Sequence, residues 1–71
     1  MNMKMNFLKN LIKKSQKYKS IQEFCTENNL NARRYYRINN SECEMMLREA
    51  ITISEILKID VYKVWKEYND Q

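Results

Sequence analysis

The stretch SIQEFCTENNLNARRYYRI, residues 20–38, decides the fold of this 71-residue chain. It opens with Ser20-Ile21-Gln22-Glu23, which has the form of a capping box. In such a box the serine hydroxyl accepts a hydrogen bond from a first-turn amide, and Glu23 reaches back to the Ser20 amide. A helix is therefore expected to begin here. It should end near Glu27, because two asparagines follow, and asparagine is the non-glycine residue that best tolerates a left-handed backbone.

A second short helix is expected directly after this turn. Asn31 supplies an N-cap in front of Ala32-Arg33-Arg34-Tyr35-Tyr36-Arg37-Ile38, and Asn39-Asn40-Ser41 should end the helix. Apolar or small residues stand where two steeply crossing helices would touch: Ile21, Phe24, Cys25, Leu30, Tyr35 and Ile38. Cys25 is informative, because a contact residue at such a close crossing must be small.

Apolar periodicity predicts three further helices. One runs from about Asn6 to Lys17, with an apolar face of Phe7, Leu8, Leu11 and Ile12. Another covers Met45 to Leu57 and offers for burial Leu47, Ala50, Ile51, Ile53, Ser54 and Leu57. The last begins near Asp60 and carries Val61, Val64, Trp65 and Tyr68 as its apolar stripe. No linker or repeat divides the chain, so we expect one compact all-α domain of five helices over residues 1–71.

The pattern of residues 20–38 resembles the Cro and lambda-repressor-like helix-turn-helix family, often called the XRE family. Most members have alanine at the position of Cys25. The resemblance covers roughly residues 7–65, including the closing segments Ile53-Ser54-Glu55-Ile56-Leu57 and Lys58-Ile59-Asp60-Val61. It departs from the family at Asn28, which replaces an apolar residue, and at Asn29, which replaces the common turn glycine. The resemblance implies a compact five-helix, lambda-repressor-like fold that binds DNA.

The resemblance also implies which residues contact bases in the major groove: Asn31, Ala32, Arg33, Tyr36, Arg37 and Asn40, with Tyr35 and Ile38 facing inward. A guanidinium fork matches O6 and N7 of guanine, and an asparagine amide similarly suits adenine. The alternative is that the arginines are only solvated. Three arginines within five residues repel one another unless an anion neutralises them, which favours a DNA contact.

The charge distribution also favours a polyanionic partner. Residues 1–40 carry nine basic and two acidic groups, a net charge of +7, whereas residues 41–71 carry four basic and seven acidic groups, a net charge of −3. One end of the chain therefore suits the DNA backbone. The expected phosphate contacts are Lys14, Lys17, Lys19 and Arg34. The resemblance adds Gln22, because the family often has a phosphate-contacting glutamine at the neighbouring position of Ile21. Each lysine taken alone is equally well explained as a solubilising charge.

The last helix, over about residues 60–69, is a candidate dimerisation helix. Aromatic residues are favoured at two-fold seams, and the expected seam residues are Val61, Val64, Trp65 and Tyr68. We therefore expect a homodimer. The alternative is that Trp65 anchors the core of a small domain.

Composition argues against an enzyme. The chain has no histidine and no glycine, which excludes histidine-based triads, histidine-ligated metals and phosphate loops. Its acids are dispersed, and Cys25 and Cys43 lack a metal-ligand spacing. We therefore expect no cofactor, no metal and no small-molecule substrate. The chain shows no signal peptide or apolar membrane span, so we expect a cytoplasmic protein with free thiols and no membrane partner.

The leading hypothesis is a sequence-specific transcriptional regulator that binds double-stranded DNA. A repressor of the phage or mobile-element type, acting by operator occupancy, fits best. The alternative is a protein-interaction module on the same fold, such as an antirepressor, an antitoxin or a phage-encoded inhibitor of a host nucleic-acid enzyme. Under either hypothesis, a regulatory protein is a further expected partner. Because a fold does not fix a function, the choice depends on what the exposed residues bind.

Overall fold

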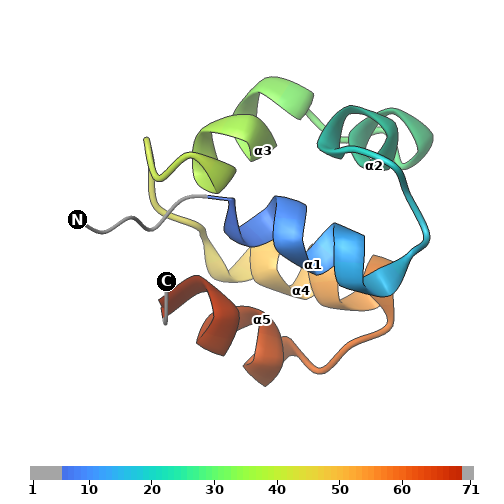
Figure 1. The fold of residues 1–71 in the computed structure, drawn as a ribbon. Coiled ribbons are helices and arrows are strands. Elements are labelled where there is room, and N and C mark those ends of the chain that lie inside the picture. The colour runs from blue at the N-terminus through green and yellow to red at the C-terminus, as the bar shows by residue number, and fades with distance from the viewer. Residues whose placement is uncertain (1–5, 70–71) are drawn as a thin grey trace.

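Five helices form the part of the chain that the structure, a computed structural model, describes, residues 6–69. They are α1 (Phe7–Ser15), α2 (Ile21–Glu27), α3 (Ala32–Asn39), α4 (Leu47–Leu57) and α5 (Val61–Asn69). No strand occurs within these residues, so the all-α prediction is confirmed. In Figure 1, α1 lies between the pair α2–α3 and the pair α4–α5.

The predicted N-caps of α2 and α3 are both present. The Ser20 hydroxyl accepts from the Glu23 amide at 3.1 Å, and the Asn31 side chain accepts from the Arg34 amide at 3.2 Å. The second half of the capping box differs from the prediction. The Glu23 carboxylate accepts from the Lys19 amide, at 2.6 Å, rather than from the Ser20 amide. The hydrogen bond to Glu23 therefore comes from Lys19, one residue before the predicted donor Ser20.

The turn between α2 and α3 contains the two asparagines, as predicted. Asn29 has a left-handed backbone with φ of 57°. The Asn28 side chain donates to the carbonyl of Phe24 at 2.7 Å and to the hydroxyl of Tyr18 at 3.2 Å. These two hydrogen bonds explain how a polar residue is accommodated at this half-buried position.

Helix α1 is shorter than predicted. It ends at Ser15 rather than near Lys17, because Gln16 has a left-handed backbone with φ of 60° and donates its amide to the Ile12 carbonyl. A left-handed residue directly after a helix stops its propagation and satisfies one of its last carbonyls. Gln16 thus takes the place that glycine often has at the end of a helix, in a chain that contains no glycine.

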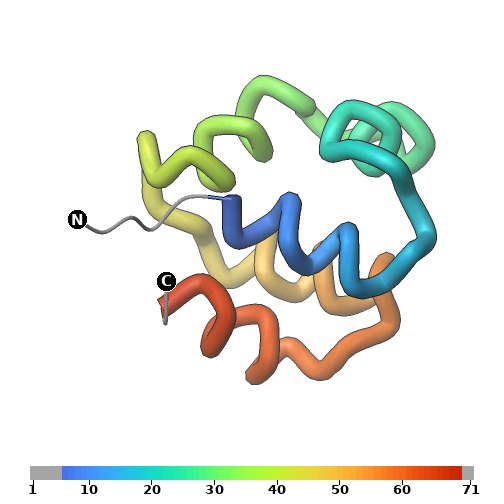
Figure 2. Tube along the Cα trace, in the orientation of Figure 1, coloured from blue at the N-terminus to red at the C-terminus, as the bar shows by residue number. Residues whose placement is uncertain are grey.

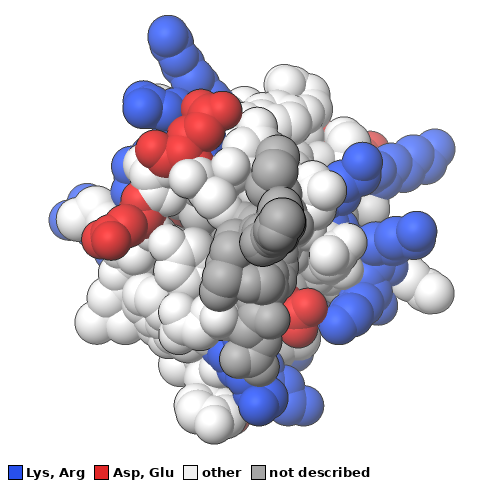
Figure 3. Space-filling model, turned by 60° about the vertical axis from the view of Figure 1, so that its left-hand side comes forward, with Lys and Arg blue, Asp and Glu red and all other residues white. Residues whose placement is uncertain are grey.

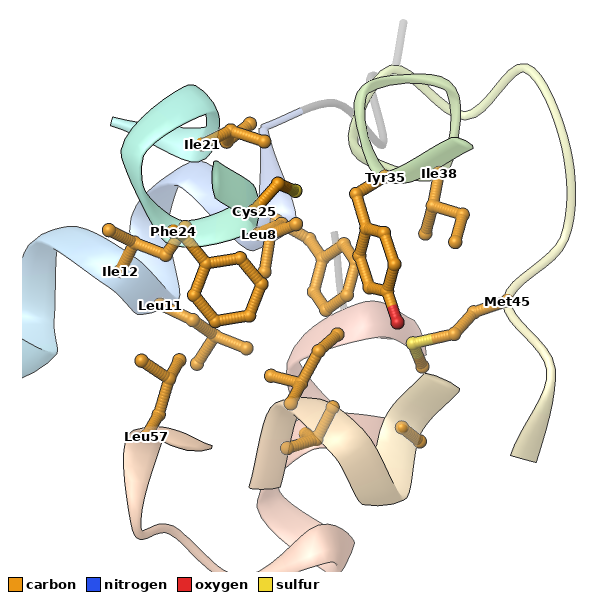
Figure 4. Packing of buried hydrophobic residues seen from close by; sticks show 14 residues of the cluster. Leu8, Leu11, Ile12, Ile21, Phe24, Cys25, Tyr35, Ile38, Met45 and Leu57 are labelled. Carbon is orange, nitrogen blue, oxygen red and sulfur yellow. The ribbon is translucent and has the colours of Figure 1, made fainter. Parts of the chain in front are cut away.

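The core draws on all five helices. The four expected residues of α1 are buried, and so are the crossing residues of α2 and α3 apart from Leu30, which is half-buried. Figure 4 shows Phe24 of α2 and Tyr35 of α3 pointing into the same core, where their rings meet edge to face at 6.1 Å. Cys25 is completely buried, which confirms its predicted packing role.

The prediction for α4 was wrong at two positions. Leu47 and Ile51 were expected to be buried but are 61% and 40% exposed. The helix begins at Leu47 instead of Met45, and the Met45 side chain enters the core from the preceding segment. The inward face of α4 therefore consists of the residues that follow the helical period from Ala50: Glu49, Ala50, Ile53, Ser54 and Leu57.

A buried asparagine joins α3 to α1. Asn6 precedes α1 but makes no side-chain capping bond. Asn39, at the end of α3, replaces it: its side-chain oxygen accepts from the Lys9 amide at 2.9 Å, and its carbonyl accepts from the Asn6 amide at 2.7 Å. The Asn39 side chain also donates to Asn40 at 3.0 Å. Asn39 thus caps α1 from another helix, and this cap fixes the two helices relative to each other.

The burial of Cys25 yields a test of the α2–α3 crossing. Cys25→Ala should be nearly neutral or mildly destabilising, whereas Cys25→Leu should overpack the crossing and lower the free energy of unfolding by roughly 1 to 3 kcal/mol. Urea or thermal unfolding of both variants measures the difference. If leucine is tolerated as well as alanine, Cys25 does not lie at a tight crossing.

Candidate nucleic-acid interface

One face of α3 is turned away from the rest of the protein. Tyr35 and Ile38 point into the core, and α3 lies at the outer edge of the chain trace (Figure 2). On the opposite face Arg33 and Arg37 are exposed, and Tyr36 is 38% exposed. Arg33, Tyr36 and Arg37 therefore lie on the side of α3 that a partner can reach, as expected from the sequence.

Arg34 is held by an acidic residue of α4. Its Nε and Nη2 atoms lie 2.5 and 2.8 Å from the two carboxylate oxygens of Glu49, a bidentate ion pair. Nη2 also donates to the Glu44 carbonyl at 2.9 Å, and Nη1 lies 3.2 Å from the Cys43 sulfur. The Arg34 guanidinium lowers the pKa of Glu49 and has its own pKa raised in return. Phosphate contact by Arg34 stays a prediction, but such a contact competes with Glu49.

Arg37 also has an acidic neighbour, whereas Arg33 has none among residues 6–69. Arg37 Nε lies 3.8 Å from Glu42, and both side chains are more than half exposed. An exposed pair of this kind contributes little to stability. The repulsion expected within the arginine cluster is therefore relieved in part by Glu49 and Glu42 of the chain itself. Among the three arginines of α3, only Arg33 has an exposed guanidinium without an ion pair within residues 6–69.

The other expected contact residues are partly used within the protein. The Asn31 oxygen caps α3, and Ala32 packs half-buried against the core. The Asn40 oxygen accepts from Asn39. Gln22 is exposed on α2 and donates to the Thr26 hydroxyl at 3.1 Å. The amide nitrogen of Asn31 and the whole side chain of Arg33 thus have no hydrogen-bond partner among the described residues.

Basic side chains beside α3 come from a different part of α1 than expected. A shallow hollow between α1, α2 and α3 is lined by Lys9, Lys19, Tyr36 and Asn40, among others. A second hollow shares Lys9 and Lys19 and adds Lys13. We call Lys9, Lys13 and Lys19 the basic edge. Lys19 was expected from the sequence to contact phosphate, whereas Lys9 and Lys13 were not. The signal for these two lysines is their four-residue spacing, which puts both on one face of a helix.

Lys14 and Lys17 lie toward the other pair of helices. Lys14 Nζ is 3.4 Å from Glu67 of α5, and both line a groove with Lys63 and Lys66. Lys17 Nζ donates to the Ile56 carbonyl at 3.3 Å. In Figure 3 basic side chains project from several sides of the molecule, and acidic ones adjoin those at the upper left. The charge asymmetry along the sequence therefore does not become a simple basic face and acidic face.

Three of the four expected dimerisation residues contact the core, and the fourth is part of it. Val64 is completely buried, so it cannot belong to an exposed seam. The Tyr68 ring meets Phe7 at 5.2 Å and Trp65 at 5.7 Å, and its hydroxyl accepts from the Met45 amide. Val61, Trp65 and Tyr68 are half-buried against the core. Dimerisation through them stays a prediction, although the exposed large apolar side chain of α5 is Tyr62, at 68%.

The described residues offer few groups for metal binding, membrane insertion or thiol chemistry. Residues 6–69 hold no cluster of three histidine, cysteine or acidic side chains able to bind a metal. Within the same range, no helix has the length and apolar character needed to cross a membrane. Neither cysteine forms a disulfide, and burial raises the pKa of Cys25 to about 11, so its thiol stays neutral near pH 7.

The Arg34–Glu49 pair makes stability depend on pH. Because the pKa of Glu49 is lowered by folding, its carboxylate stabilises the protein above its unfolded pKa, and this stabilisation is lost as the pH falls through the folded pKa. Glu49→Gln keeps an oxygen for the Met46 amide but removes the charge. The variant should have a lower melting temperature at neutral pH, and the difference from wild type should vanish between about pH 5 and pH 2.

Glu55→Gln is the matched control, because Glu55 is exposed on the same helix and has no ion pair within residues 6–69. Measured on dilute, monomeric protein, it should melt like wild type at neutral pH. A Glu49→Gln deficit that is the same at every pH would show that the charge of Glu49 contributes nothing.

Comparisons with protein-family models, with curated proteins and with solved structures found no match for this chain. What the chain binds must therefore be argued from its own residues.

Proposed function

We propose that this chain is a helix-turn-helix DNA-binding domain that inserts α3 into the major groove. In this proposal α2 and α3 form the motif, and the resemblance to the Cro and lambda-repressor-like family supplies the function class. The protein acts as a sequence-specific transcriptional regulator in the cytoplasm. It represses by occupying its operator, as phage and mobile-element repressors do.

The observation that carries the proposal is the placement of the basic edge. Lys9 and Lys19 line one hollow with Tyr36 and Asn40, so cations from α1 and from the segment between α1 and α2 flank the exposed face of α3. A helix that enters the major groove has phosphates on both sides. Lysines beside it can hold the backbone while side chains on the helix reach the bases. We therefore assign phosphate contact to Lys9, Lys13 and Lys19 rather than to Lys14 and Lys17.

The arginines of α3 divide into three roles. Arg33 is exposed without a described ion pair, so it is the first candidate for a guanine contact. Arg37 follows one turn later, and its exposed 3.8 Å contact with Glu42 is weak enough to be exchanged for DNA. Arg34 holds α3 against α4 through Glu49 and so positions the helix.

A protein-interaction module remains the second candidate, and two observations favour it. Acidic side chains of the chain itself neutralise two of the three arginines, which lessens their need for a polyanion. The exposed apolar residues of α4, Leu47 and Ile51, are of the kind that contacts proteins.

The decisive experiment separates base contacts from phosphate contacts. A preferred site is first selected from a random duplex library with the purified protein. Binding of each variant is then measured by fluorescence anisotropy on that site and on its single-base variants, at several salt concentrations. Arg33→Ala should cost about 1 to 3 kcal/mol on the preferred site and relax the preference at one base pair. Arg37→Ala should behave similarly at a neighbouring position.

Lys9→Ala and Lys19→Ala should instead weaken binding to all sequences about equally and reduce the salt slope by about one unit each. Lys14→Ala and Lys63→Ala are matched controls, because they remove the same charge from the groove between α1 and α5. They should leave binding unchanged. Uniform loss in the arginine variants would mean that α3 holds phosphate only. No duplex binding by wild type at near-physiological salt would favour the protein-interaction module.

A further inference from the structure

The outward face of α4 combines exposed apolar side chains with two opposite charges. We call Leu47, Arg48, Ile51 and Glu55 the α4 face. All four are exposed, Leu47 at 61% and Ile51 at 40%. At about 100° per residue they share one side of the helix, opposite the buried residues that begin at Glu49 and Ala50. The α4 face is therefore a continuous surface that nothing in residues 6–69 covers.

The charges on the α4 face lack ion pairs within the described chain. Arg48 and Glu55 are separated by seven residues, about 10 Å along the helix axis, which is too far for pairing within α4. The ion pairs of residues 6–69 involve other side chains. Arg48 acts on the pKa of its neighbour Glu49 only as a nearby charge. Both ends of the α4 face thus remain available to an external partner of opposite charge.

The charge pattern is complementary to itself in one orientation. If two copies of α4 pack parallel, Arg48 faces Arg48 and Glu55 faces Glu55, which is repulsive. If they pack antiparallel about a two-fold axis near Ile51, Arg48 faces Glu55 of the partner subunit, and the same pair forms again on the other side of the axis. Ile51 then meets the partner's Ile51 at the centre. Such reciprocity is the property of a two-fold interface.

We infer that the α4 face is a docking surface for a second copy of this chain, packed antiparallel across a two-fold axis. The inference goes beyond the proposed function and does not rest on it, because no DNA contact enters the argument. It also replaces the seam expected on α5, where Val64 is buried and Tyr68 is engaged with Phe7 and Met45. A single eleven-residue helix presents a small interface, so the association belongs to the weak, transient class.

Sedimentation equilibrium of the wild type over roughly 10 to 500 µM should show a reversible monomer–dimer equilibrium, as expected for a small interface. Arg48→Glu and Glu55→Arg each turn both attractive pairs into repulsive ones. Each should raise the dimer dissociation constant by about tenfold or more. Circular dichroism checks that the variants keep the wild-type helix content, which these exposed positions should not affect.

Two further samples make the test specific. The double variant Arg48→Glu/Glu55→Arg restores opposite charges across the axis, so it should dimerise like wild type. An equimolar mixture of the two single variants pairs an all-acidic α4 face with an all-basic one. It should form a heterodimer more readily than either variant forms a homodimer.

Three outcomes would overturn the inference. One is a wild type that stays monomeric throughout this range. Another is a dimer that the single charge reversals do not weaken, which would place the interface elsewhere, for example on α5. The third is a double variant that dimerises no better than the single variants, which would show that Arg48 and Glu55 do not face each other.

Discussion

The buried side chain of Asn39 fixes the relation between α1 and α3, and the proposed DNA-binding surface depends on that relation. Asn39 closes the last turn of α3 and at the same time caps α1 through the Lys9 amide. This bond places Lys9 of the basic edge in the same hollow as Tyr36 and Asn40. A polar group this deeply buried is stable only when its hydrogen bonds are made. The hydrogen bonds of Asn39 therefore fix the relative position of α1 and α3 more closely than apolar packing alone does.

The second organising feature is the contact between two acidic residues and the arginines of α3. Glu42 and Glu49 belong to the acidic half of the sequence, but they lie against Arg37 and Arg34. The bidentate pair with Glu49 is partly buried and holds α3 on α4, whereas the pair with Glu42 is exposed and weak. Arg34 is thus held within the protein, whereas Arg33 and Arg37 are exposed, a difference that composition alone does not show.

Local signals in the sequence are sufficient to predict the helices but not the surfaces that the helices form. Ser20, Asn31 and Asn29 act through bonds within a few residues, so caps and turn were predictable. The missed features depend on contacts between distant segments. Met45 enters the core from the segment before α4, the helix begins two residues later than predicted, and Leu47 and Ile51 lie on its exposed side. Similarly, Lys9 and Lys14 are both exposed lysines of α1, and only the packing of α3 and α5 against this helix shows that Lys9 lies beside α3 and Lys14 beside α5.

The central claim is that the exposed face of α3 and the basic edge together contact duplex DNA. Backbone amide chemical shifts, followed by NMR during titration with a selected duplex at near-physiological salt, test it most directly. The claim predicts the largest changes at Arg33, Tyr36 and Arg37, smaller ones at Lys9 and Lys19, and none at Lys63 on α5. Changes confined to α4 or α5, or no change at all, would contradict it.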